Sequence, residues 1–76
     1  MTPLEETILR YLSETTEVST RDVVTEIRED YQVVRQKLLG LVRDEMATCR
    51  HVDTLKWLRT PAGTAALLEQ QAHARI

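Results

Sequence analysis

Apolar residues recur at helical spacing near the N-terminus. The apolar stripe consists of Leu4, Ile8, Tyr11 and Leu12. A spacing of i, i+4, i+7 and i+8 predicts an amphipathic helix over about residues 3–13. Thr2 and Glu5 have the spacing of a capping box, and Pro3 takes the first helical position between them. The sequence therefore also predicts where this helix begins.

A polar, β-branched stretch follows at residues 13–18 and predicts a loop that ends in a short extended piece. Ser19 or Thr20 can then cap a second helix. Asp22 lies in the first turn of this helix, where a negative charge complements the helix dipole. The apolar pattern of the second helix ends near Arg28.

A third helix is predicted over about residues 31–44, with Asp30 as its cap. It follows the second helix after two or three residues, a length typical of a helix-turn-helix. One side of the third helix is apolar and is expected to face the core, at Val34, Leu38 and Leu41, with Tyr31 and Val42 beside them. The opposite side carries Gln32, Gln36, Gly40 and Arg43, flanked by Val33, Arg35, Lys37 and Leu39.

Beyond the third helix the pattern becomes that of short strands. Residues 47–51 and 55–59 flank a polar turn, which predicts an antiparallel hairpin. Thr60 and Pro61 then begin a last, alanine-rich helix. The predicted order is α-β-α-α-β-β-α, an α+β fold that is mostly helical. No internal repeat or linker divides the chain, so we expect a single domain over residues 1–76.

The length of 76 residues leaves room for one small core. Branched aliphatic residues must fill this core, because the chain has no Phe and only two Tyr and one Trp. No apolar run approaches the roughly 20 residues that span a bilayer, and the acidic N-terminal region lacks the basic segment of a signal peptide. A single cysteine fits a reducing compartment. We therefore expect a cytoplasmic protein.

The charge of the chain reverses after Tyr31. Residues 1–31 contain three Lys or Arg against eight Asp or Glu, a net charge of −5, whereas residues 32–59 contain six against three, a net charge of +3. The formal net charge of −2 for the whole chain hides this asymmetry. A locally positive surface attracts polyanions, so the predicted third helix and hairpin are candidates for contact with phosphate groups.

The exposed side of the predicted third helix carries groups that can pair with DNA bases. Glutamine pairs with N6 and N7 of adenine, and arginine with O6 and N7 of guanine. The candidates for these contacts are Gln32, Arg35, Gln36 and Arg43, with Lys37 as a phosphate ligand. On the hairpin, the candidates for contact with the phosphate backbone are Arg50, His51, Lys56 and Arg59. A solvated helix face and an edge strand protected by charge are the alternative interpretations.

Other kinds of chemistry find little support in the sequence. Cys49 and His51 would share one face of a strand, but a closed zinc site takes four ligands and there is no second cluster. We therefore predict no metal and no cofactor. Gly40 and Gly63 are isolated, so the chain has no glycine-rich phosphate loop, and it has no nucleophile motif. We predict that it is not an enzyme, and that Trp57 packs in the core instead of stacking on a base.

The order of elements, with Val18-Ser19-Thr20 opening the second helix and the ending Trp57-Leu58-Arg59-Thr60-Pro61-Ala62-Gly63, resembles a small winged helix-turn-helix domain of bacterial, archaeal or viral transcription regulators. The resemblance covers nearly the whole chain. It implies that the third helix enters the major groove of DNA and that the hairpin, or wing, lies along the backbone or minor groove. Such domains often have glycine at the end of the third helix, where this chain has Glu45, so we expect a different turn there.

The expected function is sequence-specific binding of double-stranded DNA by a small transcriptional regulator. The last helix offers apolar surface for a homodimer, above all at Leu67 and Leu68. The alternative is a winged helix that binds another protein, as an adaptor or as an antagonist of a regulator, without binding DNA. In that case the acidic face of the first two predicted helices would contact a basic partner.

Overall fold

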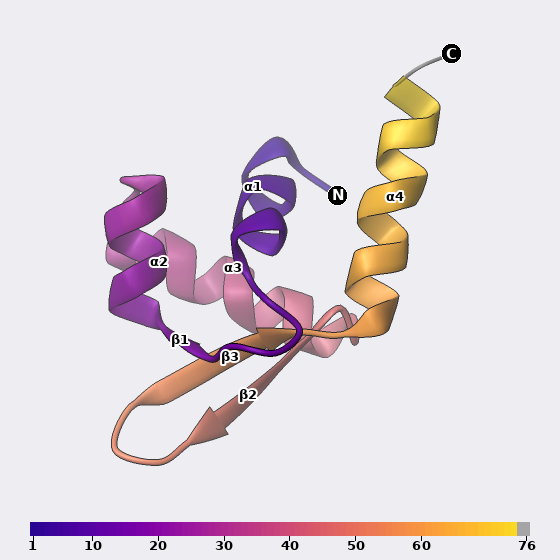
Figure 1. Cartoon of the computed structure of the whole chain (residues 1–76). Helices are drawn as coiled ribbons and strands as arrows, with labels where there is room; N and C mark the ends of the chain where they lie inside the picture. The colour runs from indigo at the N-terminus through magenta and orange to yellow at the C-terminus, as the bar shows by residue number, and fades with distance from the viewer. Residues whose placement is uncertain (75–76) are drawn as a thin grey trace.

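The computed structural model describes residues 1–74, which contain four helices and a three-stranded sheet in the predicted order. As labelled in Figure 1, they are α1 (Pro3–Tyr11), β1 (Val18–Ser19), α2 (Thr20–Ile27), α3 (Tyr31–Arg43), β2 (Ala47–His51), β3 (Leu55–Arg59) and α4 (Pro61–Ala74). The predicted α+β, mostly helical fold is confirmed. Helix α1 is shorter than expected, because the backbone is already extended at Leu12.

Capping boxes begin the first two helices. The hydroxyl of Thr2 accepts a hydrogen bond from the backbone N–H of Glu5 at 3.3 Å, and the Glu5 carboxylate accepts one from the N–H of Thr2 at 3.0 Å. Ser19 and Asp22 repeat this arrangement at the start of α2, at 3.1 and 3.0 Å. The hydrogen bonds from the cap residues lower the pKa of both carboxyl groups, because they stabilise the charged form.

The turn between α2 and α3 depends on a left-handed residue. Arg28 follows α2 with a φ of 63°, and its N–H donates to the carbonyl of Val24 at 2.7 Å. Asp30 then caps α3, and its Oδ1 accepts from the N–H groups of Gln32 and Val33 at 2.9 and 3.3 Å. These contacts leave three residues between α2 and α3, as expected for a helix-turn-helix.

The turn from α3 into the hairpin keeps a glycine-like conformation. Glu45 has a φ of 64°, in the left-handed region that favours glycine. The N–H of Glu45 donates to the carbonyl of Val42 at 3.0 Å, and the N–H of Met46 donates to the carbonyl of Leu41 at 2.9 Å. These two bonds form a Schellman motif. The expectation that Glu45 would change this turn is therefore wrong: the glutamate adopts the backbone conformation that a glycine would take.

The three strands form one antiparallel sheet in the order β1-β3-β2. Trp57 on the central strand is opposite Val18 on one side and Cys49 on the other. Side chains alternate between the two faces of a strand, so Trp57 faces the helices while its neighbours Lys56 and Leu58 lie on the other face of the sheet. Strand β2 is an edge strand, and four of its five residues are exposed.

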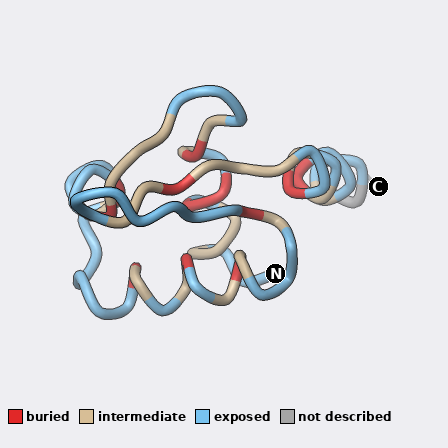
Figure 2. Tube along the Cα trace, turned by 90° about the horizontal axis from the view of Figure 1, so that it is seen from below, coloured by how far each residue is buried: buried red, intermediate tan, exposed pale blue. Residues whose placement is uncertain are grey.

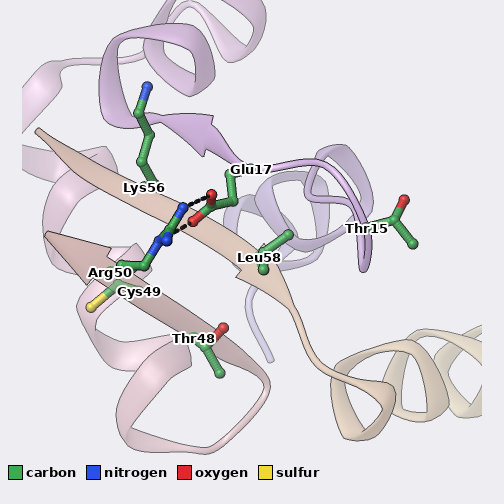
Figure 3. Close-up of a pocket in the computed structure, with 7 residues that line it drawn as sticks. All are labelled: Thr15, Glu17, Thr48, Cys49, Arg50, Lys56 and Leu58. Atoms are coloured by element: carbon green, nitrogen blue, oxygen red, sulfur yellow. Dashed lines mark hydrogen bonds and ion pairs between the residues drawn. The ribbon is translucent and has the colours of Figure 1, made fainter. Parts of the chain in front are cut away.

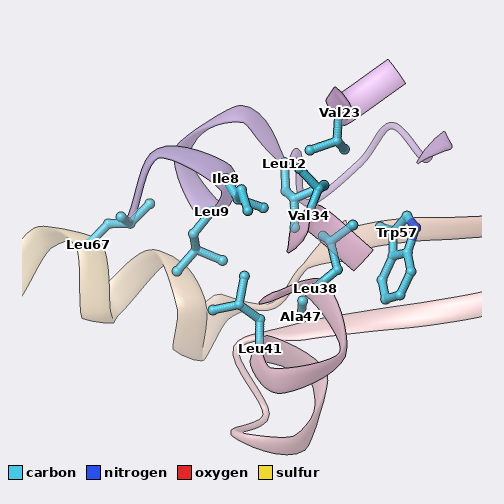
Figure 4. Packing of buried hydrophobic residues seen from close by; sticks show 10 residues of the cluster. All are labelled: Ile8, Leu9, Leu12, Val23, Val34, Leu38, Leu41, Ala47, Trp57 and Leu67. Carbon is cyan, nitrogen blue, oxygen red and sulfur yellow. The ribbon is translucent and has the colours of Figure 1, made fainter. Parts of the chain in front are cut away.

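The core lies between the helices and the sheet (Figures 2 and 4). It consists of Ile8, Leu9, Leu12, Val23, Val34, Leu38, Leu41, Ala47, Trp57 and Leu67. The Trp57 indole is fully buried, and its Nε1 donates to the hydroxyl of Thr20 at 2.8 Å. A buried indole N–H needs a hydrogen-bond acceptor. Thr20 supplies that acceptor, which explains why this polar residue is buried. The predicted packing role of Trp57 is confirmed.

Helix α4 starts close to the turn that follows α3. The hydroxyl of Thr60 donates to the carbonyl of Glu45 at 2.8 Å and accepts from the N–H of Gly63 at 3.0 Å. A Cβ atom on Gly63 would lie 2.2 Å from the carbonyl oxygen of Met46, so only glycine fits there. Beyond this point α4 leads away from the other helices (Figure 1) and contributes Leu67 to the core.

Candidate nucleic-acid interface

Helix α3 separates its apolar and polar residues onto opposite sides, as predicted. Its buried residues are Val34, Leu38 and Leu41. Gln32, Gln36 and Arg43 are exposed on the other side, and Arg35 and Lys37 are half-buried at its flanks. The fold therefore presents two amides and a guanidinium along one line of the helix surface. Among the described residues, none of these three side chains has a hydrogen-bond partner.

A groove joins the start of α2, the start of α3 and the wing. It has a volume of about 560 Å³ and is lined by Ser19, Thr20, Arg21, Tyr31, Thr54, Leu55 and Lys56. The described lining contains two basic side chains and no acidic one. The nearby Asp22, whose pKa is lowered mainly by hydrogen bonds from Ser19 and to a small extent by Lys56, would compete with an anion for Lys56. Of the predicted site residues, Lys56 lies in this groove. The sequence reasoning missed Arg21, because it belongs to the acidic half of the chain and its approach to the wing depends on tertiary structure.

The sequence predicts Tyr31 either beside the core or at the start of the third helix; the core position is wrong, and Tyr31 is the first residue of α3. Its side chain is 47% exposed and lines the groove. Side chains of a helix point back toward its N-terminus, so Tyr31 extends past the start of the helix, whereas Val34 one turn later reaches the core.

Arg50 on the wing is paired with an acidic residue. Figure 3 shows its guanidinium reaching over β3 to Glu17, which precedes β1. The Nε of Arg50 donates to Glu17 Oε2 at 2.9 Å, and Nη2 contacts Oε1. The hydrogen bond and charge of Glu17 raise the pKa of Arg50. A phosphate group at Arg50 therefore has to compete with this carboxylate, although the guanidinium side chain is 66% exposed. The two residues are 33 positions apart, and no sequence pattern indicates the pair.

The remaining basic candidates lie in different surroundings. His51 is exposed at the end of β2, opposite Leu55. Lys37 lies beside α1, where its charge makes a minor contribution, after the hydrogen bonds from Thr2, to the lowered pKa of Glu5. Neither residue lines the groove between α2, α3 and the wing.

Arg59 was grouped with the phosphate-contacting residues of the hairpin, and the structure does not support that role. Its Nη1 donates to the carbonyl of Leu9 in α1 at 3.1 Å, and its Nε is buried without a partner among the described residues. Arg59 shares the core-facing side of β3 with Trp57, two residues earlier. It therefore connects the end of the sheet to α1 and does not extend from the wing into solvent.

Within residues 1–74, no group of three or more His, Cys, Asp or Glu is placed to hold a metal ion. Cys49 is an exposed free thiol. In the same part of the chain no helix has the length and apolar character needed to cross a membrane.

Together, the helix-turn-helix of α2 and α3, the β2–β3 wing and the flanking helices define a winged helix-turn-helix fold. The chain is similar to a solved structure of BpsR from Bordetella bronchiseptica, with a TM-score of 0.87 and 24% sequence identity. The DNA binding of BpsR is regulated by 6-hydroxynicotinic acid. The similarity covers 99% of this chain and 56% of BpsR, so the chain spans a little over half the length of that protein. No protein-family model matches the chain, and no curated protein matches it.

Proposed function

We propose that this protein binds double-stranded DNA as a transcriptional regulator, with α3 in the major groove and the wing on the backbone. The observation that carries the proposal is the exposed line of Gln32, Gln36 and Arg43 on α3. In a helix-turn-helix, the N-terminal part of the second helix presents side chains such as Gln32 and Gln36 to base edges, and Arg43 at the end of α3 would contact a phosphate. The fold is similar to that of a part of BpsR, a DNA-binding protein.

The groove between α2, α3 and the wing supports the same orientation. A backbone phosphate beside the start of α3 would lie between Arg21 and Lys56, the two bases of the groove. Arg35 then extends the basic surface along the helix. Arg50 on the wing would contact a phosphate in competition with Glu17, and His51 adds a ring N–H donor at the end of β2. Because the net charge of residues 32–59 is only +3, we expect weak affinity for each subunit.

A dimer would bind DNA more tightly than one subunit. Helix α4 exposes Leu68, of which 62% is accessible, together with the exposed small residues Ala65 and Ala72. Leu67 was predicted to share this interface, but it is 8% exposed and packs in the core, so it is not available to a partner. We propose that two copies pair through the Leu68 side of α4, which places two half-sites about one DNA turn, or a multiple of it, apart. A monomer mass from light scattering at high concentration would remove this part of the proposal.

The rival function is recognition of a basic protein by the acidic helices α1 and α2. Its support is the net charge of −5 on residues 1–31. Two of the acidic side chains there, Glu5 and Asp22, are occupied with capping their own helices. Those two groups are therefore less available to a partner than the sequence alone indicates.

Binding to a random-sequence duplex at two salt concentrations distinguishes the two functions. DNA binding through phosphate contacts weakens as salt rises. We expect Arg43→Ala to weaken DNA binding. If Arg43 contacts a phosphate, the plot of log binding constant against log salt concentration should also become less steep by about one unit. The control is Arg10→Ala, which removes the same charge from α1, where Arg10 is paired with Glu6 at 2.6 Å. Absence of salt-dependent binding, or equal losses in both variants, would favour the rival.

A further inference from the structure

Two aliphatic residues of α3 are exposed outside the core. Val33 and Leu39 are 41% and 40% exposed, although the apolar side of the helix is complete without them at Val34, Leu38 and Leu41. A β-branched residue also favours the helix less than alanine does. Neither helix propensity nor the core therefore accounts for Val33 at this position.

Gln36 lies between these two apolar side chains. Val33 precedes it by three positions and Leu39 follows it by three, and side chains at this spacing are neighbours on a helix. Gly40, one turn after Gln36, adds no side chain beside it. A Cβ atom there would meet only the end of the flexible Arg43 side chain, at 3.7 Å. The result is a narrow strip in which the Gln36 amide is flanked by two aliphatic side chains, with the end of the Arg43 side chain near Gly40.

The chemistry of this strip matches A·T base pairs. In the major groove, adenine offers the N6 and N7 pair that an amide recognises, and thymine adds a methyl group that an aliphatic side chain can cover. A G·C pair has no methyl group, and its usual partners are arginine for guanine and a carboxylate for cytosine. Of the two arginines of α3, Arg35 is half-buried at the flank of the helix and Arg43 is its last residue, whereas base contacts in a helix-turn-helix come from the N-terminal part of the second helix.

We propose that α3 selects A·T base pairs, with Gln36 pairing with adenine while Val33 and Leu39 contact thymine methyl groups. This inference rests on the proposed DNA binding and specifies its substrate. Removing a methyl group from such a contact changes affinity about fourfold, from the transfer free energy of one buried CH₂ group. A bidentate amide pair discriminates against the wrong base by about five- to 150-fold.

Three synthetic duplexes of equal length test the inference by competition at one salt concentration. They contain alternating A·T pairs, the same sequence with uracil in place of thymine, and alternating G·C pairs. Uracil keeps the base pairing and lacks only the methyl group. We expect the A·T duplex to bind at least about fourfold more tightly than the A·U duplex, and the G·C duplex to bind more weakly than either.

Two variants test whether the strip of Val33, Gln36 and Leu39 causes the preference for A·T base pairs. Val33→Ala is expected to reduce the difference between thymine and uracil, and alanine at this exposed helical position preserves folding. Its control, Val52→Ala, removes the same atoms from a 59% exposed valine in the wing turn and should leave the ratio unchanged. Gln36→Ala should reduce the preference for A·T over G·C and keep the preference for thymine over uracil.

The possible failures are distinguishable. Salt-dependent binding with equal affinity for thymine and uracil, or with preference for G·C, overturns the A·T inference and leaves the proposed DNA binding in place. A thymine preference that persists unchanged in Val33→Ala also overturns the assignment to this strip. Absence of binding to all three duplexes overturns the proposed function itself.

Discussion

Replacing Glu45 by glycine should stabilise the protein. Glu45 has a φ of 64°, a conformation that costs a non-glycine residue about 1–2 kcal/mol. Glycine removes this cost. It also makes the unfolded chain more flexible, which lowers the free energy of unfolding by about 0.5–1 kcal/mol. The side chain of Glu45 is exposed, and the turn is held by backbone groups: the N–H bonded to Val42 and the carbonyl bonded to Thr60. We therefore expect Glu45→Gly to raise the free energy of unfolding by about 0.7 kcal/mol, the difference between the midpoints of the two ranges.

Urea unfolding measures this gain as a higher midpoint with an unchanged slope. Glu45→Ala is the matched control, because it removes the same charge and still requires a left-handed alanine, so it should give no comparable gain. Asp44→Gly is a second control: the φ of Asp44 is −86°, and glycine there should be destabilising. If Glu45→Gly were no more stable than Glu45→Ala, backbone strain at Glu45 would be excluded as the reason.

Three further changes test other parts of the fold by the same unfolding assay. Gly63→Ala should destabilise the protein by about 1–3 kcal/mol, because its Cβ would lie 2.2 Å from the Met46 carbonyl oxygen; an unchanged midpoint would contradict that close approach. Trp57→Phe should cost about 1–3 kcal/mol, since it leaves the buried hydroxyl of Thr20 without its indole donor, and a neutral result would show that this bond is dispensable. Glu5→Gln should lower stability at neutral pH. Because the folded-state pKa of Glu5 is below its ordinary value of 4.5, the contribution is present above that value and is lost as the pH falls through the lowered pKa. A difference from the wild type that persists in acid would contradict this linkage.

The helices and the hairpin were predictable because their signals are local. Helical spacing of apolar residues, the capping box of Thr2 and Glu5, the cap at Ser19 and the Thr60-Pro61 start each involve residues within one or two turns of each other. The boundaries of α2, α3 and both hairpin strands therefore agree closely with expectation. The conformation at Glu45 was not predictable, because its side chain disfavours the φ that the Schellman hydrogen bonds impose.

The candidate interface was only partly predictable, for a different physical reason. The exposed side of α3 follows from the helical period, so Gln32, Gln36 and Arg43 were identified from spacing alone. The groove depends on how α2 approaches the wing, which brings Arg21 next to Lys56 across more than thirty positions of sequence. The pairing of Arg50 with Glu17 also depends on strand order, since β3 lies between them. Tertiary contacts of this kind leave no pattern in the sequence.

Selection of bound duplexes from a random DNA pool tests the central claim most directly. If α3 contacts base edges in the major groove, repeated rounds should enrich one short motif, and a dimer should enrich it as an inverted repeat with half-sites one helical turn, or a multiple of it, apart. Selection with Gln36→Ala should then relax the motif at the positions that this side chain contacts. A wild-type pool that stays random would contradict sequence-specific binding by α3, and a motif identical in both proteins would contradict base contact by Gln36.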